Sequence, residues 1–194
     1  MVRIENALNG VERGARLAAH LLAFARRQPL QSAVVDLTPV LAEMDDMLRR
    51  VLGPRALVVA DIAPRLWNTD VDVDQLNNVI LNLAINARDA MGGDGTLTIR
   101  ARNLPAGSEQ LVKIGDGQGD YVLIEIADTG AGMSSEVMQR AFEPFFTTKP
   151  TGQGTGLGLS MAYGFVKQSG GEIALQSTLG TGTCVQIYLS LIHI

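Results

Sequence analysis

The sequence predicts an α+β fold, in which helices cover a sheet. Residues 121–127 form a nearly continuous apolar run, which is typical of a central strand. Residues 74–91 instead carry apolar side chains on one side of a long helix. Residues 172–177 and 183–189 are expected to form an antiparallel pair around a glycine-bearing turn. A chain of 194 residues suits one good-sized domain with an appendage.

The appendage is a helix expected over residues 4–27. Its apolar residues are spaced alternately four and three apart, as in the seam of a helix bundle. They are Ile4, Leu8, Val11, Ala15, Ala18, Leu22 and Ala25. Pro29 ends the helix, because its ring cannot continue one. We expect the helix to join an intermolecular bundle, and packing on its own domain is the alternative.

The remaining elements are bounded by capping residues, glycines and prolines. In chain order we expect an extended piece at 33–35, a helix capped by Asp36 or Thr38 and ending near Leu52, strands over 57–62 and 96–101, a hairpin loop over 105–119, a short helix over 136–142, a segment of lid-like composition over 145–155 and a helix over 157–168. Residues 190–194 fit none of these elements and look like a translated sequencing-adapter read-through, so we exclude them from the fold.

Composition excludes several classes of protein. The formal net charge of −4 argues against a nucleic-acid-binding protein, which usually carries a basic excess. One cysteine, Cys184, cannot form an internal disulfide, and without a signal peptide this indicates a reducing cytosol. No apolar run reaches the roughly 18 residues of a membrane helix. We expect a cytoplasmic domain without direct membrane contact, and a membrane anchor elsewhere in a longer parent protein stays open.

The first candidate binding motif lies on the helix over 74–91. Asn82, Asn86 and Asp89 are four and three residues apart, so they share one helical face. Mg²⁺ takes oxygen ligands and shares them with substrate phosphates. A solvated surface is the alternative, but such surfaces favour lysine and glutamate over short amides.

The second motif directly follows the central strand and consists of Asp128, Gly130 and Gly132. The Asp128 carboxylate can accept a hydrogen bond from the exocyclic amine of adenine. It would repel the carbonyl that guanine carries at the same position. The two glycines would let the backbone approach the ring. The alternative is an ordinary strand-end turn.

The third motif is a glycine-rich loop that precedes the helix over 157–168. Backbone N–H groups in such a loop, together with the helix N-terminus, suit a polyphosphate. The spacing is neither that of a P-loop nor that of the dinucleotide fingerprint. The residues expected to bind phosphate are Gly154, Thr155, Gly156, Leu157 and Gly158.

The fourth motif covers residues 142–149 and contains Phe145, Phe146 and Lys149. The Lys149 ammonium is expected to reach the phosphates as a point charge. The two phenylalanines are candidates for pinning this segment to the domain, and one of them is expected to be plain core.

In their order and spacing these motifs resemble the catalytic, ATP-binding domain of sensor histidine kinases, over residues 4–189. The resemblance implies the Bergerat (GHKL) fold: a two-layer sandwich of a mixed, mostly antiparallel sheet packed on helices, preceded by one long bundle helix. It makes residues 1–29 the second helix of a dimerisation hairpin and residues 30–189 the catalytic domain. Residues 190–194 remain an artefactual tail.

The resemblance also implies the chemistry. ATP and Mg²⁺ are the expected cofactors, and the γ-phosphoryl group is transferred to a histidine. Asn86 would hold Mg²⁺, Asn82 would support the metal or the phosphates, and Lys149 would complete the catalytic set. Asp89 stands where other branches of the family have lysine. Expected partners are the dimerisation hairpin of the same kinase, as a homodimer, and the receiver domain of a response regulator.

Two other functions stay open. ATP-driven clamps and chaperones of the gyrase and Hsp90 type carry a water-activating glutamate where this chain has Asn82, and an amide cannot act as a base. A nucleotide-binding pseudokinase is the other alternative, against which intact Asn86 and Asp128 argue. Neither His20 nor His193 has the context of a phosphoacceptor, so we expect that histidine to come from a segment outside this sequence. Thr181 and Gly182 are expected to shape the back of the site.

Overall fold

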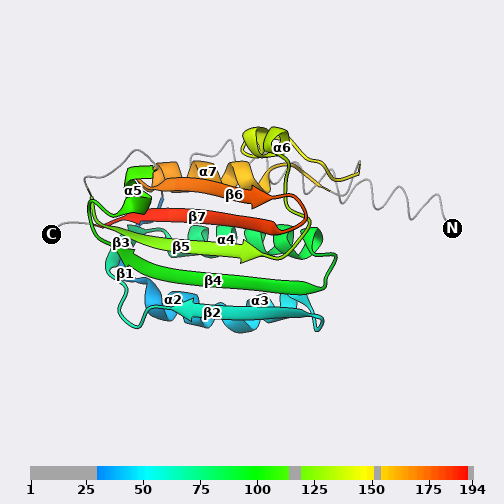
Figure 1. The fold of residues 1–194 in the computed structure, drawn as a ribbon. Helices are drawn as coiled ribbons and strands as arrows, with labels where there is room; N and C mark the ends of the chain where they lie inside the picture. Colours follow the sequence, from blue (N-terminus) through cyan, green and yellow to red (C-terminus); the bar gives the residue numbers. More distant parts are fainter. Residues whose placement is uncertain (1–29, 114–118, 151–153, 192–194) are drawn as a thin grey trace.

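The computed structural model describes residues 30–113, 119–150 and 154–191. Within them a five-stranded sheet has the strand order β2-β4-β5-β7-β6 (Figure 1). Its strands are β2 (Ala56–Ile62), β4 (Gly95–Leu104), β5 (Tyr121–Asp128), β6 (Glu172–Thr178) and β7 (Gly182–Ser190). β2 and β4 are parallel, whereas the other neighbouring pairs are antiparallel. The sheet is therefore mixed and mostly antiparallel, as predicted.

The central position of β5 follows from its sequence. The first six residues of this strand are buried, because helices cover one face of the sheet and a second apolar cluster covers part of the other. β4 and β7 flank the strand on its two sides. The antiparallel register with β7 places Asp128, the last residue of β5, beside Thr183. The strand thus delivers a carboxylate to the end of the sheet at which the site lies.

One face of the sheet is covered by helices (Figure 1). These are α2 (Leu37–Glu43), α3 (Asp45–Leu52), α4 (Val73–Ala90) and α7 (Gly158–Gln168). Two short helices, α5 (Glu109–Lys113) and α6 (Ser135–Arg140), lie in the connections that follow β4 and β5. The apolar side of α4 is buried in the core beneath the sheet, so its polar side is left for other contacts. The result is the predicted two-layer sandwich.

The helix expected to end at Leu52 is two helices, α2 and α3. Asp36 caps α2, and its Oδ1 accepts the N–H of Thr38 at 2.8 Å. The chain turns at Met44, after which two aspartates begin α3, where their charge favours a helix N-terminus. The buried residues keep steps of three and four across the break. They are Leu37, Leu41, Met44, Leu48 and Leu52. Because the periodicity is continuous, it could not indicate the break.

Two further elements were not predicted. β3 (Asn68–Val71) pairs antiparallel with β1 (Ala33–Asp36) and forms a separate two-stranded sheet. Its sequence, Asn-Thr-Asp-Val, has little strand character. The expected hairpin loop over 105–119 also contains α5, whose Leu111 is completely buried against residues of the sheet's second face.

The C-terminal residues differ from the expectation. Ser190 is the last residue of β7, and Leu191 pairs with Thr69 while its N–H donates to the carbonyl of Asp120 at 2.9 Å. Excluding these two residues from the fold was therefore wrong. The helix expected over residues 4–27, His20, and residues 192–194 lie outside the described residues. No helix in the described part of the chain has the length and apolar character needed to cross a membrane.

Candidate functional site

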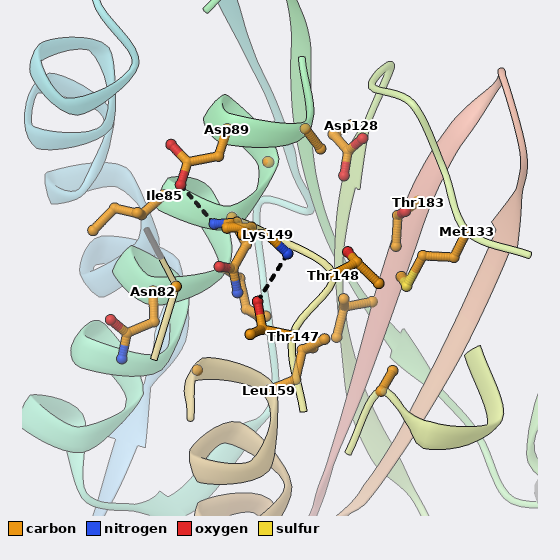
Figure 2. A pocket seen from close by; sticks show the side chains of 18 of the residues that line it. Asn82, Ile85, Asp89, Asp128, Met133, Thr147, Thr148, Lys149, Leu159 and Thr183 are labelled. Atoms are coloured by element: carbon orange, nitrogen blue, oxygen red, sulfur yellow. Dashed lines mark hydrogen bonds and ion pairs between the residues drawn. The ribbon is translucent and has the colours of Figure 1, made fainter. Parts of the chain in front are cut away.

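A cavity of about 1140 Å³ opens beside α4, and all four sequence motifs contribute to its wall (Figure 2). A volume of this order suits a ligand as large as a nucleotide. The predicted site residues that line it are Asn82, Asn86, Asp89, Asp128, Gly132, Lys149, Gly154, Thr155, Gly156 and Gly158. Two predicted residues, Gly130 and Leu157, do not line the cavity and are buried behind it.

The asparagines are positioned by the rotation of α4. Asp72 caps this helix by accepting the N–H of Gln75 at 3.1 Å. The opposite side of the helix is buried in the core, which turns Asn82 and Asn86 toward the cavity. A β-carbon at Gly158 would lie 3.0 Å from the Asn86 amide nitrogen, so the first turn of α7 sits directly against Asn86. The first motif and the glycine-rich motif therefore meet at this point.

Asp128 is held in a fixed orientation at the end of β5. Its Oδ1 accepts the N–H of Gly130 at 2.8 Å. Burial raises the pKa of the carboxyl group, and backbone hydrogen bonds from Gly130 and Thr183 oppose this rise. The carboxylate is thus partly desolvated and orientated by the backbone, which suits recognition of a hydrogen-bond donor in the cavity.

Position 132 requires a glycine because its backbone packs directly against another part of the protein. Gly132 has φ +65°, and a β-carbon there would overlap the Thr178 carbonyl oxygen at the end of β6. The turn between β6 and β7 approaches the same loop, since the Gly180 N–H donates to the Ala131 carbonyl at 2.7 Å. That Gly130 and Gly132 let the backbone approach an adenine ring stays a prediction. For Gly132 the structure shows a further reason for a glycine, which is close packing of the loop against the end of β6.

The start of β7 contributes to the cavity wall a residue that sequence reasoning did not single out. Thr183 lines the wall, whereas Thr181 is exposed and lies outside it. A β-carbon at Gly182 would overlap the Asp128 carbonyl oxygen, so this glycine lets β7 lie close to the end of β5. Position 182 is therefore a packing position behind the site, as expected.

Lys149 and Asp89 form an ion pair at the edge of the cavity (Figure 2). The Lys149 Nζ lies 2.6 Å from Asp89 Oδ2, and Arg88 Nη2 lies 2.9 Å from Asp89 Oδ1. Desolvation raises the pKa of Asp89, but the hydrogen bonds and charges of Lys149 and Arg88 outweigh it and hold the pKa below its usual value. Asp89 is therefore ionised and engaged with two cations.

The expectation that one phenylalanine of the fourth motif is plain core was wrong. Phe145 is 54% exposed, and Phe146 is partly buried in the cavity wall, with the Arg140 guanidinium 4.3 Å from its ring centre. Phe145 also has φ +67°. Its N–H donates to the Gly156 carbonyl at 2.9 Å, and a β-carbon at Gly156 would overlap the Phe145 backbone. The phenylalanine motif and the glycine loop are therefore joined backbone to backbone.

The N-terminus of α7 faces the cavity at Gly158. The helix has 11 residues, and its N-cap residue, Leu157, provides no side-chain hydrogen bond. The first N–H groups of such a helix have no partner within the helix and favour an anion. The predicted phosphate-binding loop therefore has the helix terminus that its chemistry requires.

The comparisons with known proteins agree with this geometry. The family model described as "Histidine kinase-, DNA gyrase B-, and HSP90-like ATPase" matches residues 71–193. The chain belongs to this family.

Two curated relatives illustrate the match. The chain is 46% identical over 187 residues to sensor kinase CckA of Brucella abortus, covering 96% of this chain and 20% of that protein. It is 34% identical to sensor histidine kinase ZraS of Klebsiella oxytoca, covering 90% of this chain and 35% of that protein. The chain thus spans a minor part of the length of these relatives.

Solved structures show the same fold. The mycobacterial sensor histidine kinase MprB matches with a TM-score of 0.65 at 23% identity, over 82% of this chain and 97% of that structure. Full-length ShkA in complex with AMPPNP matches with a TM-score of 0.68 at 22% identity, over 98% of this chain and 36% of that structure. The chain has the ATP-binding fold of the family.

Within this fold, the apolar wall of the cavity is the part that motif reasoning missed. Among its residues are Ile126, Met133, Val137, Ala141, Leu159 and Val185. In sequence they resemble ordinary core, because Ile126 and Val185 continue the buried faces of β5 and β7. The position of Ile126, two residues before the carboxylate, is a signal that could have identified it, since successive inward side chains of a strand share one face.

The donors on α4 fit a magnesium ion that is shared with phosphates. No group of three or more histidines, cysteines, aspartates or glutamates is placed to hold a metal within the described residues. Asn82 and Asn86 instead place two neutral side-chain amides in the cavity wall, and an amide oxygen is a ligand that Mg²⁺ accepts. Mg²⁺ commonly keeps several waters and takes only one or two protein ligands plus substrate phosphates.

Proposed function

We propose that the chain is the catalytic domain of a sensor histidine kinase, which transfers the γ-phosphoryl group of Mg·ATP to a histidine. The observation that carries this proposal is the state of the carboxylates in the cavity wall. Among the described residues these are Asp89 and Asp128. The first is paired with Lys149 and Arg88, and the second accepts backbone N–H groups. Neither is free to activate water, which favours transfer over hydrolysis.

The residue at position 82 supports the same choice. ATPases of the gyrase and Hsp90 type are expected to carry a glutamate there, and this chain presents Asn82 to the cavity. An amide has no basic lone pair at neutral pH, so it cannot take a proton from water. The clamp or chaperone alternative therefore lacks its base.

Each remaining residue has a role in binding or charge neutralisation. Asp128 would accept the adenine amine. Asn86, supported by Asn82, would hold the magnesium ion, which supplies charge neutralisation at the phosphates. Lys149 and the backbone N–H groups at Gly156 and Gly158 would bind the remaining phosphate oxygens. Phosphoryl transfer depends mostly on such positioning and electrostatic stabilisation.

The acceptor and the partners belong to the same proposal. Residues 1–29 would form the second helix of a dimerisation hairpin, and the phosphorylated histidine would lie on a segment outside this sequence. The full-length kinase would be a homodimer that passes the phosphoryl group to the receiver domain of a response regulator. CckA and ZraS are named as sensor kinases, which supports this assignment.

A transfer assay tests the proposal. The chain is incubated with labelled Mg·ATP and a separately supplied dimerisation hairpin that carries the phosphoacceptor histidine. We expect acid-labile phosphate on the hairpin, and we expect Asn86→Ala to abolish it. Asn78→Ala is the matched control, since Asn78 is an exposed residue of α4 outside the cavity wall.

Two results would contradict the proposal. Steady release of phosphate without acceptor would indicate an ATP-driven clamp. Tight binding of Mg·ATP with neither transfer nor release, across hairpins from several kinases, would indicate a pseudokinase.

A further inference from the structure

The cation of the cavity wall is already neutralised in this structure. Lys149 is the one lysine or arginine that lines the cavity among the described residues. Its ammonium lies 2.6 Å from Asp89, which is 60 residues earlier in the chain. The two side chains are 32% and 31% exposed, so the pair is partly shielded from solvent. A polyphosphate entering the cavity would therefore meet a lysine that has a carboxylate partner.

The stem of Lys149 is also confined on its other side. A β-carbon at Gly154 would lie 3.1 Å from Lys149 Cδ and 2.7 Å from Thr147 Oγ1. The Lys149 backbone N–H donates to the same Thr147 oxygen at 3.2 Å. The lysine thus lies between the glycine loop and α4, and Asp89 sets where its ammonium points.

Asp89 would keep a partner if Lys149 left. Arg88 contacts Asp89 Oδ1 through Nε at 3.2 Å and through Nη2 at 2.9 Å. The Arg88 Nη1 donates to the carbonyl of Val51 in α3 at 3.3 Å, which anchors the guanidinium to the body of the domain. Arg88 is not part of the cavity wall. Loss of the lysine would therefore leave the carboxylate compensated by a fixed cation.

We propose that Asp89 is a positioning residue that holds Lys149 in the nucleotide-free cavity and competes with the nucleotide polyphosphate for its ammonium. The inference rests on the proposed function, because it takes an adenine nucleotide as the ligand. Arg88 makes the exchange possible by keeping Asp89 paired after the lysine turns to the phosphates. Asp89 accordingly acts through Lys149 and binds no part of the nucleotide, in contrast to the ligand role expected from the motif.

The proposal predicts that removing Asp89 tightens polyphosphate binding. A partly exposed ion pair contributes up to about 1 kcal/mol, so Asp89→Asn should increase the affinity for ADP by about two- to fivefold. Adenosine has no phosphate and should bind the variant and the wild-type chain equally. A purely structural role of Asp89 would weaken both ligands alike.

Calorimetry with ADP and adenosine is the test, carried out on the wild-type chain, Asp89→Asn, Lys149→Met and the double variant. The gain in ADP affinity should vanish when Lys149 is methionine, because there is no ammonium to release. Arg88→Gln should weaken ADP binding when Asp89 is present. Asp94→Asn is the matched control: it removes the same charge from the exposed turn after α4, outside the cavity wall, and should leave ADP affinity unchanged.

Unchanged or weaker ADP binding by Asp89→Asn, with wild-type binding intact, would overturn this inference alone. A gain in ADP affinity that persists when Lys149 is methionine would also overturn it, since the gain would then come from the loss of a negative charge near the cavity and not from release of the Lys149 ammonium. Absence of ADP binding by the wild-type chain would overturn the proposed function together with the inference.

Discussion

Replacing Asp128 by asparagine keeps the shape of the side chain but removes its charge and replaces one acceptor oxygen with a donor NH₂ group. In the structure, Oδ1 accepts the Gly130 N–H at 2.8 Å, and the Thr183 N–H also bonds to the carboxylate. An asparagine would keep its oxygen on the backbone donors, because its NH₂ group cannot accept from them. The NH₂ group would then face the cavity, opposite the amine of adenine.

The size of the effect follows from that geometry. A hydrogen bond to a charged acceptor contributes about 1.5–3 kcal/mol. Each 1.4 kcal/mol is a factor of ten in affinity, so ADP should bind Asp128→Asn about 10- to 150-fold more weakly. Inosine diphosphate, which has a carbonyl in place of the amine, should lose little or gain affinity, because an amide NH₂ can donate to that carbonyl.

Calorimetric titration of both nucleotides is the assay, and the ratio of the two affinities is the decisive quantity. Asp120→Asn is a matched control, since Asp120 accepts the Ala106 N–H at 2.7 Å in a loop outside the cavity wall. If folded Asp128→Asn binds ADP as tightly as the wild-type chain and keeps its preference over inosine diphosphate, Asp128 is not the adenine acceptor.

Three other predictions follow from the same structure. Burial raises the pKa of Asp128, so ionisation of this carboxyl group destabilises the folded chain above the folded-state pKa and has no such effect below the unfolded-state pKa. In urea unfolding, Asp128→Asn should therefore be more stable than the wild-type chain at pH 7, and the difference should shrink as the pH falls toward 4. Gly156→Ala should cost about 1–3 kcal/mol of local stability, because φ is +65° and the added β-carbon would overlap the Phe145 backbone. Hydrogen exchange of the Phe145 amide should therefore become faster. Gly164→Ala is the control, since a β-carbon there meets open space on α7 and should not have this effect. Burial raises the pKa of Cys184 to about 11, so iodoacetamide at pH 8 should label the folded chain much more slowly than the urea-unfolded chain.

The sequence predicted those parts of the fold that have a strong period or a distinctive motif. The central strand and α4 are examples: a short, nearly continuous apolar run between turns indicates a buried strand, and apolar residues on one face of a long segment indicate an amphipathic helix. The break at Met44 was missed because the buried residues on both sides keep one helical spacing. β3 was missed because four mostly polar residues form a strand only through pairing with β1.

Motif membership alone did not determine position in the site. Leu157 belongs to the glycine-rich motif but is a buried residue outside the cavity wall. The partner of Asp89 was also not predictable, since Lys149 lies 60 residues away and only the folded chain brings the two together. Sequence spacing predicted most of the site residues that line the cavity, whereas the contacts among them required the structure.

The central claim is that this cavity binds an adenine nucleotide together with magnesium held by Asn86. Calorimetry of a non-hydrolysable ATP analogue, with Mg²⁺ and with EDTA, tests it most directly in the wild-type chain and in Asn86→Ala. We predict clearly tighter binding with Mg²⁺ for the wild-type chain, and loss of that difference in Asn86→Ala with the metal-free affinity retained. Equal affinity of the wild-type chain with and without Mg²⁺, or an undiminished Mg²⁺ effect in Asn86→Ala, would contradict the claim.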